Sequence, residues 1–240
     1  MRRFYDSQPF TTNQPAELGP DASHHIGKVL RMRPGDEIVL FNGSGGEWQA
    51  RIEAINRKTV SVLPVRFDPI DRTPSVPVTC LLPMIKGERM DYAIQKGTEL
   101  GAARFQLVTT EHTDVRLSGD RLEKKIGHLQ RVAISACEQC GMNRVADVLA
   151  PVPLDEALAS INAELRLVGQ PGAPSLPAQR LDRVASIALL TGPEGGLSDN
   201  ELDLARQAGF SGFSLGERVL RAETAPVAVL GMLWGLLYNS

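Results

Sequence analysis

Two glycine-containing turns near the end of the chain have the composition of a ligand-binding site. The first reads GPEGG at residues 192–196 and follows the apolar run 187–190; the second, at residues 215–217, follows the run 210–214. Short apolar runs closed by Gly or Pro indicate buried strands that end in turns. Ligands of open α/β sheets bind where strands end, and glycines let a ligand approach the backbone closely. The pattern therefore predicts that these turns hold a ligand.

A helix is expected after each turn. Ser198 and Glu201 form a capping-box pattern, and Gly209 marks the end of the helix that they begin. Thr224 is a suitable N-cap for a second helix, whose residues 227–237 are apolar nearly all round. A helix of that kind is buried on most faces, either in a core or between subunits.

These two stretches carry a family resemblance. GPEGGLSDNEL at residues 192–202 and LGERVLRAETAPVAVL at residues 215–230 closely resemble the RsmE-type ribosomal RNA methyltransferases of the SPOUT superfamily. The resemblance covers almost the whole chain. It implies an α/β protein with two parts: a C-terminal domain with a parallel sheet and a deep trefoil knot, and a small N-terminal PUA-like β-barrel. Sequence physics alone would argue against a knot, because knotted chains are rare.

The resemblance also implies a reaction. The cofactor would be S-adenosylmethionine, and the acceptor would be N3 of a uridine in 16S (small-subunit) ribosomal RNA, on the assembled 30S subunit. That nitrogen must lose a proton, and charge then develops on the uracil oxygens, where a fixed cation or amide donor would help. The residues expected at the cofactor are Leu190, Thr191, Gly192, Glu194, Gly195, Gly196, Leu215, Gly216, Val219 and Leu220.

Arg221 and Glu223 are the candidates for the acceptor side of the site. The alternative for this pair is a salt bridge near the start of the last helix, together with a helix-dipole contact. SPOUT family members pair through this domain, so the resemblance and the apolar last helix together favour a homodimer.

Composition sets limits on these expectations. The 240 residues, 42% hydrophobic and 22% charged, suit one large or two modest domains. With a net charge of -2, any RNA contact must come from a local patch. Three cysteines fit a reducing cytosol rather than a disulfide scaffold. The first residues lack an apolar signal core, and the longest apolar run is too short to span a membrane, so we expect a cytoplasmic protein.

The N-terminal part, residues 1–68, is predicted to be a small barrel. Residues 37–41, 47–55 and 59–65 read as strands, preceded by a helix over residues 23–32 capped by Ser23. Residues 1–33 carry five Lys or Arg and three Asp or Glu. This local excess fits phosphate contact, with a solvated surface as the alternative, and the resemblance favours RNA. The candidate RNA-binding residues here are Arg2, Arg3, His25, Arg31 and Arg33.

A proline-rich linker at residues 67–77 precedes the second predicted domain, residues 76–240. Its strands are expected at residues 78–84, 105–109, 165–169 and 187–190, and its helices include residues 86–100 and 122–140. Strands alternating with helices indicate a parallel sheet covered on both faces. The loop 170–179 is either a linker or a cover for the cofactor site.

Further family-like motifs contribute Lys86, Glu138, Gln139 and Arg144 as RNA-binding candidates. Two positions depart from the family pattern: Met142 stands where arginine is usual, and Ala146 where proline is usual. The C-x-x-C at residues 137–140 lies late in a helical pattern, unlike the helix-start position of redox motifs, and is interpreted as coincidence. Two adjacent histidines, His24 and His25, lack the neighbours that a metal site needs.

Other functions are weighed against this one. Neither G-x-G-x-x-G nor a P-loop motif occurs between strand and helix, which disfavours a dinucleotide or nucleoside triphosphate enzyme. A non-catalytic RNA-binding protein that retains the SPOUT fold, and a SPOUT enzyme with a different target nucleotide, remain as alternatives.

Overall fold

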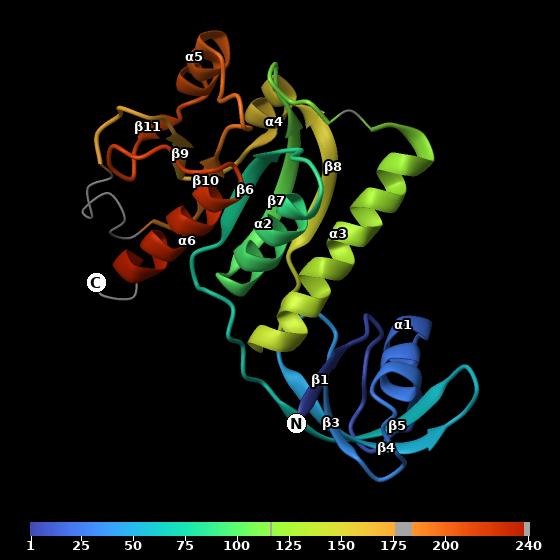
Figure 1. Cartoon of the computed structure of the whole chain (residues 1–240). Helices are drawn as coiled ribbons and strands as arrows, with labels where there is room; N and C mark the ends of the chain where they lie inside the picture. Colours follow the sequence, from blue (N-terminus) through green and yellow to red (C-terminus); the bar gives the residue numbers. More distant parts are fainter. Residues whose placement is uncertain (116, 176–183, 238–240) are drawn as a thin grey trace. The chain divides into compact units, whose positions relative to one another are not determined.

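The computed structural model describes residues 1–115, 117–175 and 184–237 and divides the chain into two compact units (Figure 1). Unit 1 consists of Met1–Thr73 and Cys137–Val145, and unit 2 of Pro74–Ala136 and Ala146–Ser240. The predicted range 76–240 placed residues 137–145 in the second domain, whereas their contacts group them with the N-terminal unit.

Unit 1 is built on a five-stranded sheet with the strand order β1-β3-β4-β5-β2. Its β1–β3 pair is parallel, and the other pairs are antiparallel. Apolar side chains such as Phe4, Ile38 and Ile52 alternate towards a common core. The strands are β1 (Arg2–Tyr5), β2 (Ala16–Glu17), β3 (Glu37–Phe41), β4 (Glu47–Ile55) and β5 (Val60–Asp68).

The helical segment of unit 1 starts earlier than the sequence predicts. Helix α1 (Pro20–His24) is followed by a π-helical turn, η1 (His25–Val29), with Pro20 in the first turn. Ser23 is therefore not the N-cap. Its hydroxyl donates to the Leu18 carbonyl at 2.9 Å and accepts from the Val60 amide at 3.0 Å, so it joins the helix to β5 inside the core. The prediction of a Ser23 cap was wrong because a tertiary partner uses the same oxygen.

Unit 2 contains a six-stranded sheet with the order β11-β9-β10-β6-β7-β8, and every neighbouring pair in it is parallel. The predicted parallel sheet is confirmed. Because all strands run in one direction, their carboxyl ends share one edge of the sheet. The strands are β6 (Val78–Pro83), β7 (Ala102–Thr109), β8 (Asp147–Pro153), β9 (Leu165–Gly169), β10 (Ile187–Leu190) and β11 (Ser211–Phe213).

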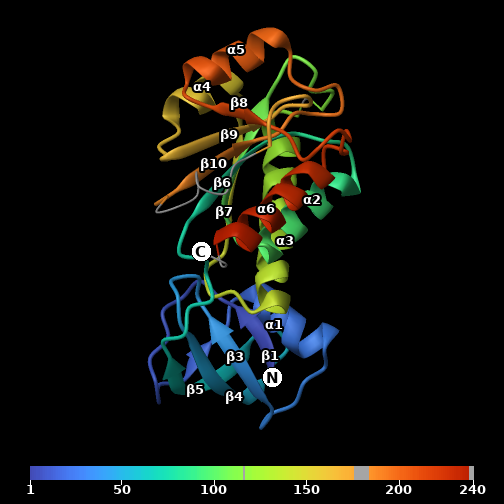
Figure 2. The same ribbon diagram turned by 90° about the vertical axis from the view of Figure 1, so that its left-hand side faces the viewer.

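Helices cover both faces of this sheet, with α2, α3 and α6 on one side and α4 and α5 on the other (Figure 2). In α5 the predicted capping box is present: the Glu201 amide donates to Ser198 Oγ at 3.2 Å, and the Ser198 amide donates to Glu201 Oε2 at 2.8 Å. Thr224 is the first residue of α6 rather than its cap. The helices are α2 (Glu88–Glu99), α3 (Gly119–Cys140), α4 (Leu154–Ser160), α5 (Asp199–Gln207) and α6 (Thr224–Leu237).

No helix in the described part of the chain has both the length and the apolar character needed to cross a bilayer.

Two elements of unit 2, β8 and α4, are missing from the sequence prediction. Strand β8 contains Pro151 and Pro153, which argue against a central strand, and it pairs only with β7 at the end of the sheet.

A buried carboxylate organises unit 1. Glu47, 8% exposed, forms an ion pair with Arg3 and accepts from Arg72 Nη1 at 2.9 Å and from Asn143 Nδ2 at 2.8 Å. Burial by itself would raise the pKa of Glu47, but these hydrogen bonds outweigh it and lower the pKa from 4.5 to about 2. Arg3 also donates to the Met142 carbonyl at 3.1 Å. The network therefore joins β1, β4 and the linker to residues 137–145.

This network predicts acid sensitivity of unit 1. Because the pKa of Glu47 is lower in the folded chain than in the unfolded chain, its stabilisation is fully present above pH 4.5 and is lost as the pH falls towards 2. We expect Glu47→Gln to lower the free energy of unfolding at pH 7 by about 2–3 kcal/mol, and this deficit to shrink below pH 4. Denaturant unfolding measures this free energy. It is followed by Trp48 fluorescence in a Trp234→Phe background, so that the signal comes from unit 1 alone.

The matched control is Glu53→Gln, an exposed position on the same strand β4. It should leave the free energy of unfolding within about 0.5 kcal/mol of the parent. A deficit for Glu47→Gln that is unchanged between pH 7 and pH 3 would contradict the assigned role of the carboxylate.

Candidate functional site

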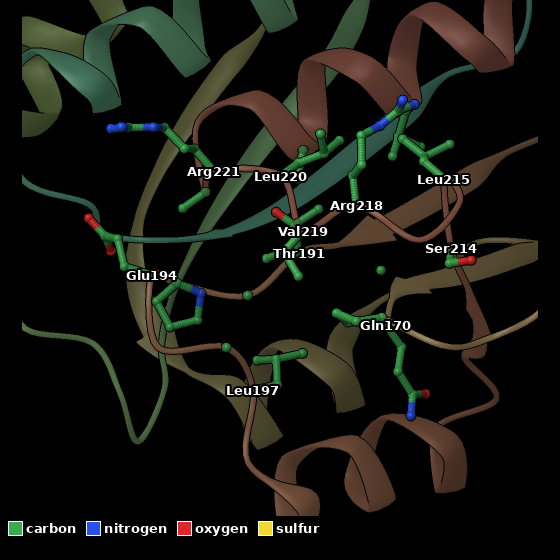
Figure 3. Close-up of a pocket in the computed structure, with 18 of the residues that line it drawn as sticks. Gln170, Thr191, Glu194, Leu197, Ser214, Leu215, Arg218, Val219, Leu220 and Arg221 are labelled. Carbon is green, nitrogen blue, oxygen red and sulfur yellow. The ribbon is translucent and has the colours of Figure 1, made fainter.

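A cavity of about 570 Å³ lies in unit 2 at the carboxyl ends of β9, β10 and β11 (Figure 3). The segments that follow these three strands form most of its wall, and α6 with the residues before it closes another side. Parallel pairing of β9 with both β10 and β11 brings the three strand ends together, although they are far apart in the sequence. The backbone-rich part of the wall consists of Gly169, Gln170, Thr191, Gly192, Gly196, Ser214, Leu215 and Gly216.

Backbone hydrogen bonds hold these segments in place. The Thr191 amide donates to the Leu81 carbonyl at 3.3 Å, which ties the first turn to β6. The Gln170 amide donates to the Phe213 carbonyl at 2.9 Å, and Ser214 Oγ donates to the Ala173 carbonyl at 2.7 Å. The segments after β9 and β11 are therefore joined to each other as well as to the sheet.

Glycine is required at several points of this wall. A Cβ atom on Gly192 would lie 3.1 Å from the Leu197 nitrogen and 3.2 Å from the Gly196 carbonyl carbon, so a side chain there would be in tight contact with the backbone of the turn. Gly196 and Gly216 adopt φ angles of 74° and 92°, which L-residues with a side chain avoid. The turns thus expose main chain to the cavity because their conformation excludes side chains.

One buried hydroxyl in the cavity wall has no partner. Thr191 is 2% exposed, and its Oγ1 makes no hydrogen bond with any described residue. An unsatisfied buried hydroxyl costs about 1–3 kcal/mol. The Thr191 oxygen is itself inaccessible to solvent, so it does not present a hydrogen-bonding group to the cavity. The wall is otherwise largely apolar, with Leu197, Phe213, Leu220 and Val229 among its residues. An apolar pocket of this size with a few polar groups suits a small organic ligand.

Cations surround the cavity. Arg89 of α2 pairs with Glu194 of the first turn at 3.0 Å. Arg218 and Arg221 also line the cavity, are exposed, and form no ion pair with other described residues. Figure 3 shows these two side chains leaving the loop in different directions. Arg218 and Arg221 therefore place unpaired positive charge next to the cavity, where it can interact with an anionic group of a ligand.

The predicted cofactor residues are largely brought together at this cavity. Leu190 and Gly195 are exceptions: Leu190 is buried in β10, and Gly195 is at the surface of the turn. The eight that line the cavity are Thr191, Gly192, Glu194, Gly196, Leu215, Gly216, Val219 and Leu220.

The two acceptor-side candidates are placed differently from each other. Arg221 lines the cavity, whereas Glu223 is buried at the start of α6 and does not. Glu223 Oε2 has no hydrogen-bond partner among the residues that the structure describes. The predicted alternative, a salt bridge between Arg221 and Glu223, is not formed within this part of the chain.

The predicted RNA-binding residues are spread over both units. In unit 1, Arg2, Arg31, Arg33 and Gln139 are exposed, while Arg3 is committed to Glu47. In unit 2, Lys86 pairs with Asp114 at 2.7 Å.

Glu138 has a structural role in unit 1. It accepts the Tyr5 amide at 3.0 Å and lies 3.9 Å from His25 Nδ1. Burial raises the pKa of Glu138 despite these contacts. Arg144 donates to Asp71 at 2.9 Å. Glu138 and Arg144 therefore hold the segment 137–145 within unit 1, whatever they contribute to RNA binding.

Some cavity residues were not predicted: Arg89, Phe213 and Ser214 line the cavity. Arg218 also lines it, within the predicted turn 215–220 but not among the residues singled out, and so do Gln170 and Pro171. Gln170 and Pro171 follow β9 as the glycine turns follow β10 and β11, so their position after an apolar run was the available signal. Gln170 and Pro171 are the first residues of the predicted loop 170–179, of which residues 176–179 lie outside the described residues.

No group of three His, Cys, Asp or Glu side chains arranged for a metal ion occurs in the described ranges.

The first glycine turn is braced from outside the cavity by His112. Its Nδ1 lies 3.0 Å from the Gly196 carbonyl oxygen, so the ring must carry its proton on Nδ1 to donate. The His112 side chain also packs on the turn, since a Cβ on Gly195 would lie 3.0 Å from His112 Cβ and 3.3 Å from the ring atom Cγ. The neighbouring Glu111 amide donates to Glu201 Oε1 at 2.8 Å. The loop after β7 therefore supports both the turn and the start of α5.

Comparison with known proteins agrees with this geometry. Residues 72–234 match the RNA methyltransferase domain family, and residues 18–65 match the RNA methyltransferase PUA domain family. The ribosomal RNA small subunit methyltransferase E of Synechocystis is 34% identical over 220 residues, which cover 89% of this chain and 71% of that protein. The enzyme of the same name from Bacillus subtilis is 30% identical over 238 residues, covering 92% and 93%.

Two solved structures are similar over nearly their whole length. A ribosomal RNA small subunit methyltransferase E from Neisseria gonorrhoeae, bound to S-adenosyl methionine, has a TM-score of 0.91 and 33% identity and covers 98% of each chain. A Legionella pneumophila protein in complex with the bound cofactor SAM has a TM-score of 0.92 and 35% identity, with 97% of this chain and 96% of that chain covered.

The His112 brace can be tested without a ligand. We expect His112→Ala to speed amide exchange at Gly196, whose N–H donates to the Pro193 carbonyl within the turn, by about fivefold, because about 1 kcal/mol of support is lost. His112→Asn, which retains a donor, should recover part of the protection. Hydrogen exchange followed by NMR measures both. His24→Ala, an exposed histidine of unit 1, is the control; equal exchange rates in His112→Ala and His24→Ala would contradict the brace.

Proposed function

We propose, because this chain belongs to the family of ribosomal RNA small subunit methyltransferases E, that it transfers a methyl group from S-adenosylmethionine to N3 of a uridine in 16S ribosomal RNA. The observation that carries the proposal is the cavity at the ends of β9, β10 and β11, whose wall combines glycine-rich main chain with apolar side chains. The assembled 30S subunit is the proposed form of the substrate.

The residues of the cavity fit S-adenosylmethionine. Leu197, Leu220 and Val229 offer apolar surface for the faces of an adenine ring, and the bare peptide groups of the two glycine turns suit its polar edge. When bound, the cofactor supplies an electrophilic methyl group. The protein's task is then to hold the acceptor nitrogen in line with that methyl group.

The acceptor side requires positive charge. When N3 of a uridine loses its proton, negative charge develops on the neighbouring oxygens, and a fixed cation stabilises it most strongly where water is excluded. Arg221 lines the cavity, carries a permanent charge and has no ion-pair partner in the described ranges, so it is the proposed stabilising group. Glu223, buried just before α6, is proposed to position this segment.

Unit 1 is proposed to contact the RNA. It matches the PUA domain family of RNA methyltransferases, and Arg2, Arg31 and Arg33 present exposed cations. Guanidinium groups bind phosphate oxygens with two parallel hydrogen bonds. Unit 1 would thus bind the phosphate backbone of the RNA, while the cavity of unit 2 accepts the target base.

Family membership also supports three properties of the protein as proposals. The first is a deep trefoil knot in unit 2. The second is a homodimer, for which α6 offers a suitable surface: its sequence is apolar, and Gly231 and Gly235 on it are exposed. The third is a cytoplasmic location, where ribosomal subunits assemble. Light scattering of the purified protein tests the homodimer directly.

The enzymatic proposal predicts a specific effect of Arg221. We expect Arg221→Ala to lower kcat for methylation of undermodified 30S subunits by about 100-fold, because it removes the cation that stabilises developing charge. The Kd for S-adenosylmethionine, measured by calorimetry, should change less than about threefold. Radiolabelled methyl incorporation gives the rate, and mass spectrometry of the ribosomal RNA identifies the modified nucleotide and atom.

Arg206→Ala is the control, since Arg206 is an exposed arginine of α5 paired with Asp203. It should retain the parent rate. Wild-type protein that binds the subunit but incorporates no methyl group would favour the alternative of a non-catalytic RNA-binding protein. Incorporation at another base or atom would retain the enzyme and change its target.

A further inference from the structure

One face of α3 carries cations that the cofactor site does not use. Arg121, Lys124 and Arg131 are all exposed on this 22-residue helix. At 100° per residue, the three fall within about 80° of arc, and they extend along about 15 Å of the axis. They are called the basic face of α3 below.

The basic face is not neutralised in the way that solvated helices usually are. None of its three residues forms an ion pair with any residue in the described ranges. Glu123 lies about 200° around the helix from Arg121 and so points away. Asp120, four residues before Lys124, lies in the first turn, where the helix dipole stabilises it, and no ion pair joins the two. The chain as a whole is slightly acidic, so this concentration of unpaired cations is local.

Two other basic residues of α3, Lys125 and His128, are paired with a carboxylate of the neighbouring helix α2. Asp91 accepts from Lys125 Nζ at 2.8 Å and contacts His128 Nε2 at 2.6 Å. These hydrogen bonds lower the pKa of Asp91 against the opposing effect of its burial, so the carboxylate stays charged and paired. Asp91 is therefore paired with Lys125 and His128 and does not neutralise Arg121, Lys124 or Arg131.

The position of α3 relates the basic face to the cavity. The helix starts after the loop that leaves the carboxyl end of β7, and that loop contributes His112 to the brace of the glycine turn. Arg121 and Lys124 in the first turns of α3 are therefore on the side of unit 2 towards which β9, β10 and β11 also end. From there the basic face continues along α3 as far as Arg131.

We propose that the basic face of α3 binds backbone phosphates of the RNA that flank the methylated nucleotide. The inference rests on the proposed function, because RNA is the proposed substrate of the cavity. In this proposal unit 2 binds RNA through the basic face of α3, in addition to the contacts made by the exposed arginines of unit 1. Contacts of this kind are electrostatic, independent of base sequence, and released by salt.

The test compares two double variants with the same change in net charge. Arg121→Gln/Arg131→Gln removes two cations of the basic face, and Arg104→Gln/Arg206→Gln removes two exposed arginines of unit 2 that are paired with Asp147 and Asp203. Binding of each protein to undermodified 30S subunits and to protein-free 16S ribosomal RNA is measured over a range of KCl concentrations. The slope of log affinity against log salt gives the number of phosphates that the protein neutralises, because each one releases its counterions.

We expect the slope for the basic-face variant to be less steep than that of the parent by about 1.4–1.8, corresponding to two lost phosphate contacts. Its KM for 30S subunits should rise by about tenfold at 0.1 M salt, with kcat, the Kd for S-adenosylmethionine and the melting temperature unchanged. The Arg104/Arg206 variant should match the parent. Slopes that are equal for the two variants, or a basic-face variant indistinguishable from the parent, would overturn the proposal.

The binding arm separates this proposal from the proposed function. If the parent protein binds RNA with the expected salt slope but transfers no methyl group, the enzymatic proposal fails and the basic face is still tested by the slopes. If methyl transfer is observed and the slopes of all three proteins agree, the enzyme stands and the basic face of α3 is rejected.

Discussion

The candidate site depends on parallel pairing of β9 with β10 on one side and β11 on the other. In a parallel sheet the strand direction is the same throughout, so segments that follow the strands must all leave at one edge. Here three such segments, separated by many residues in the sequence, form a single cavity wall. Reversing any one of these strands would move its turn to the opposite edge and remove that part of the wall.

The composition of the wall follows from how closely a ligand must approach it. A side chain on Gly192 would contact the backbone of residues 196–197 tightly, because the turn folds back on them, and Gly196 and Gly216 hold positive φ angles. Their peptide groups therefore face the cavity without being screened by side chains. Such a wall is rigid only if it is supported from behind, and His112 and the Glu201 carboxylate supply that support from the loop after β7 and from α5.

Unit 1 depends on a different kind of interaction. The Glu47 carboxylate is buried, and its charge is retained because Arg3, Arg72 and Asn143 donate to it. All three donors lie far from Glu47 in the sequence, and Asn143 comes from the segment after α3. The network explains why residues 137–145 fold with the N-terminal unit, although they follow a helix that begins in unit 2. Family-like motif residues such as Glu138 and Arg144 are held in the same segment.

The sequence by itself determined the strands whose apolar pattern is local and strong, such as β9 and β10, the capping box of α5, and the two turns that need glycine. It also carried the family, since residues 192–202 and 215–230 are specific enough to identify it, and the comparisons with known proteins confirm the assignment. Tertiary structure decided what local patterns do not encode. Ser23 is not a cap because β5 uses its hydroxyl, and β8 is a strand despite its prolines because it pairs on one side only. Arg89 reaches the cavity, and Glu223 does not, because strand order and helix packing place side chains whose sequence neighbourhoods show no sign of it.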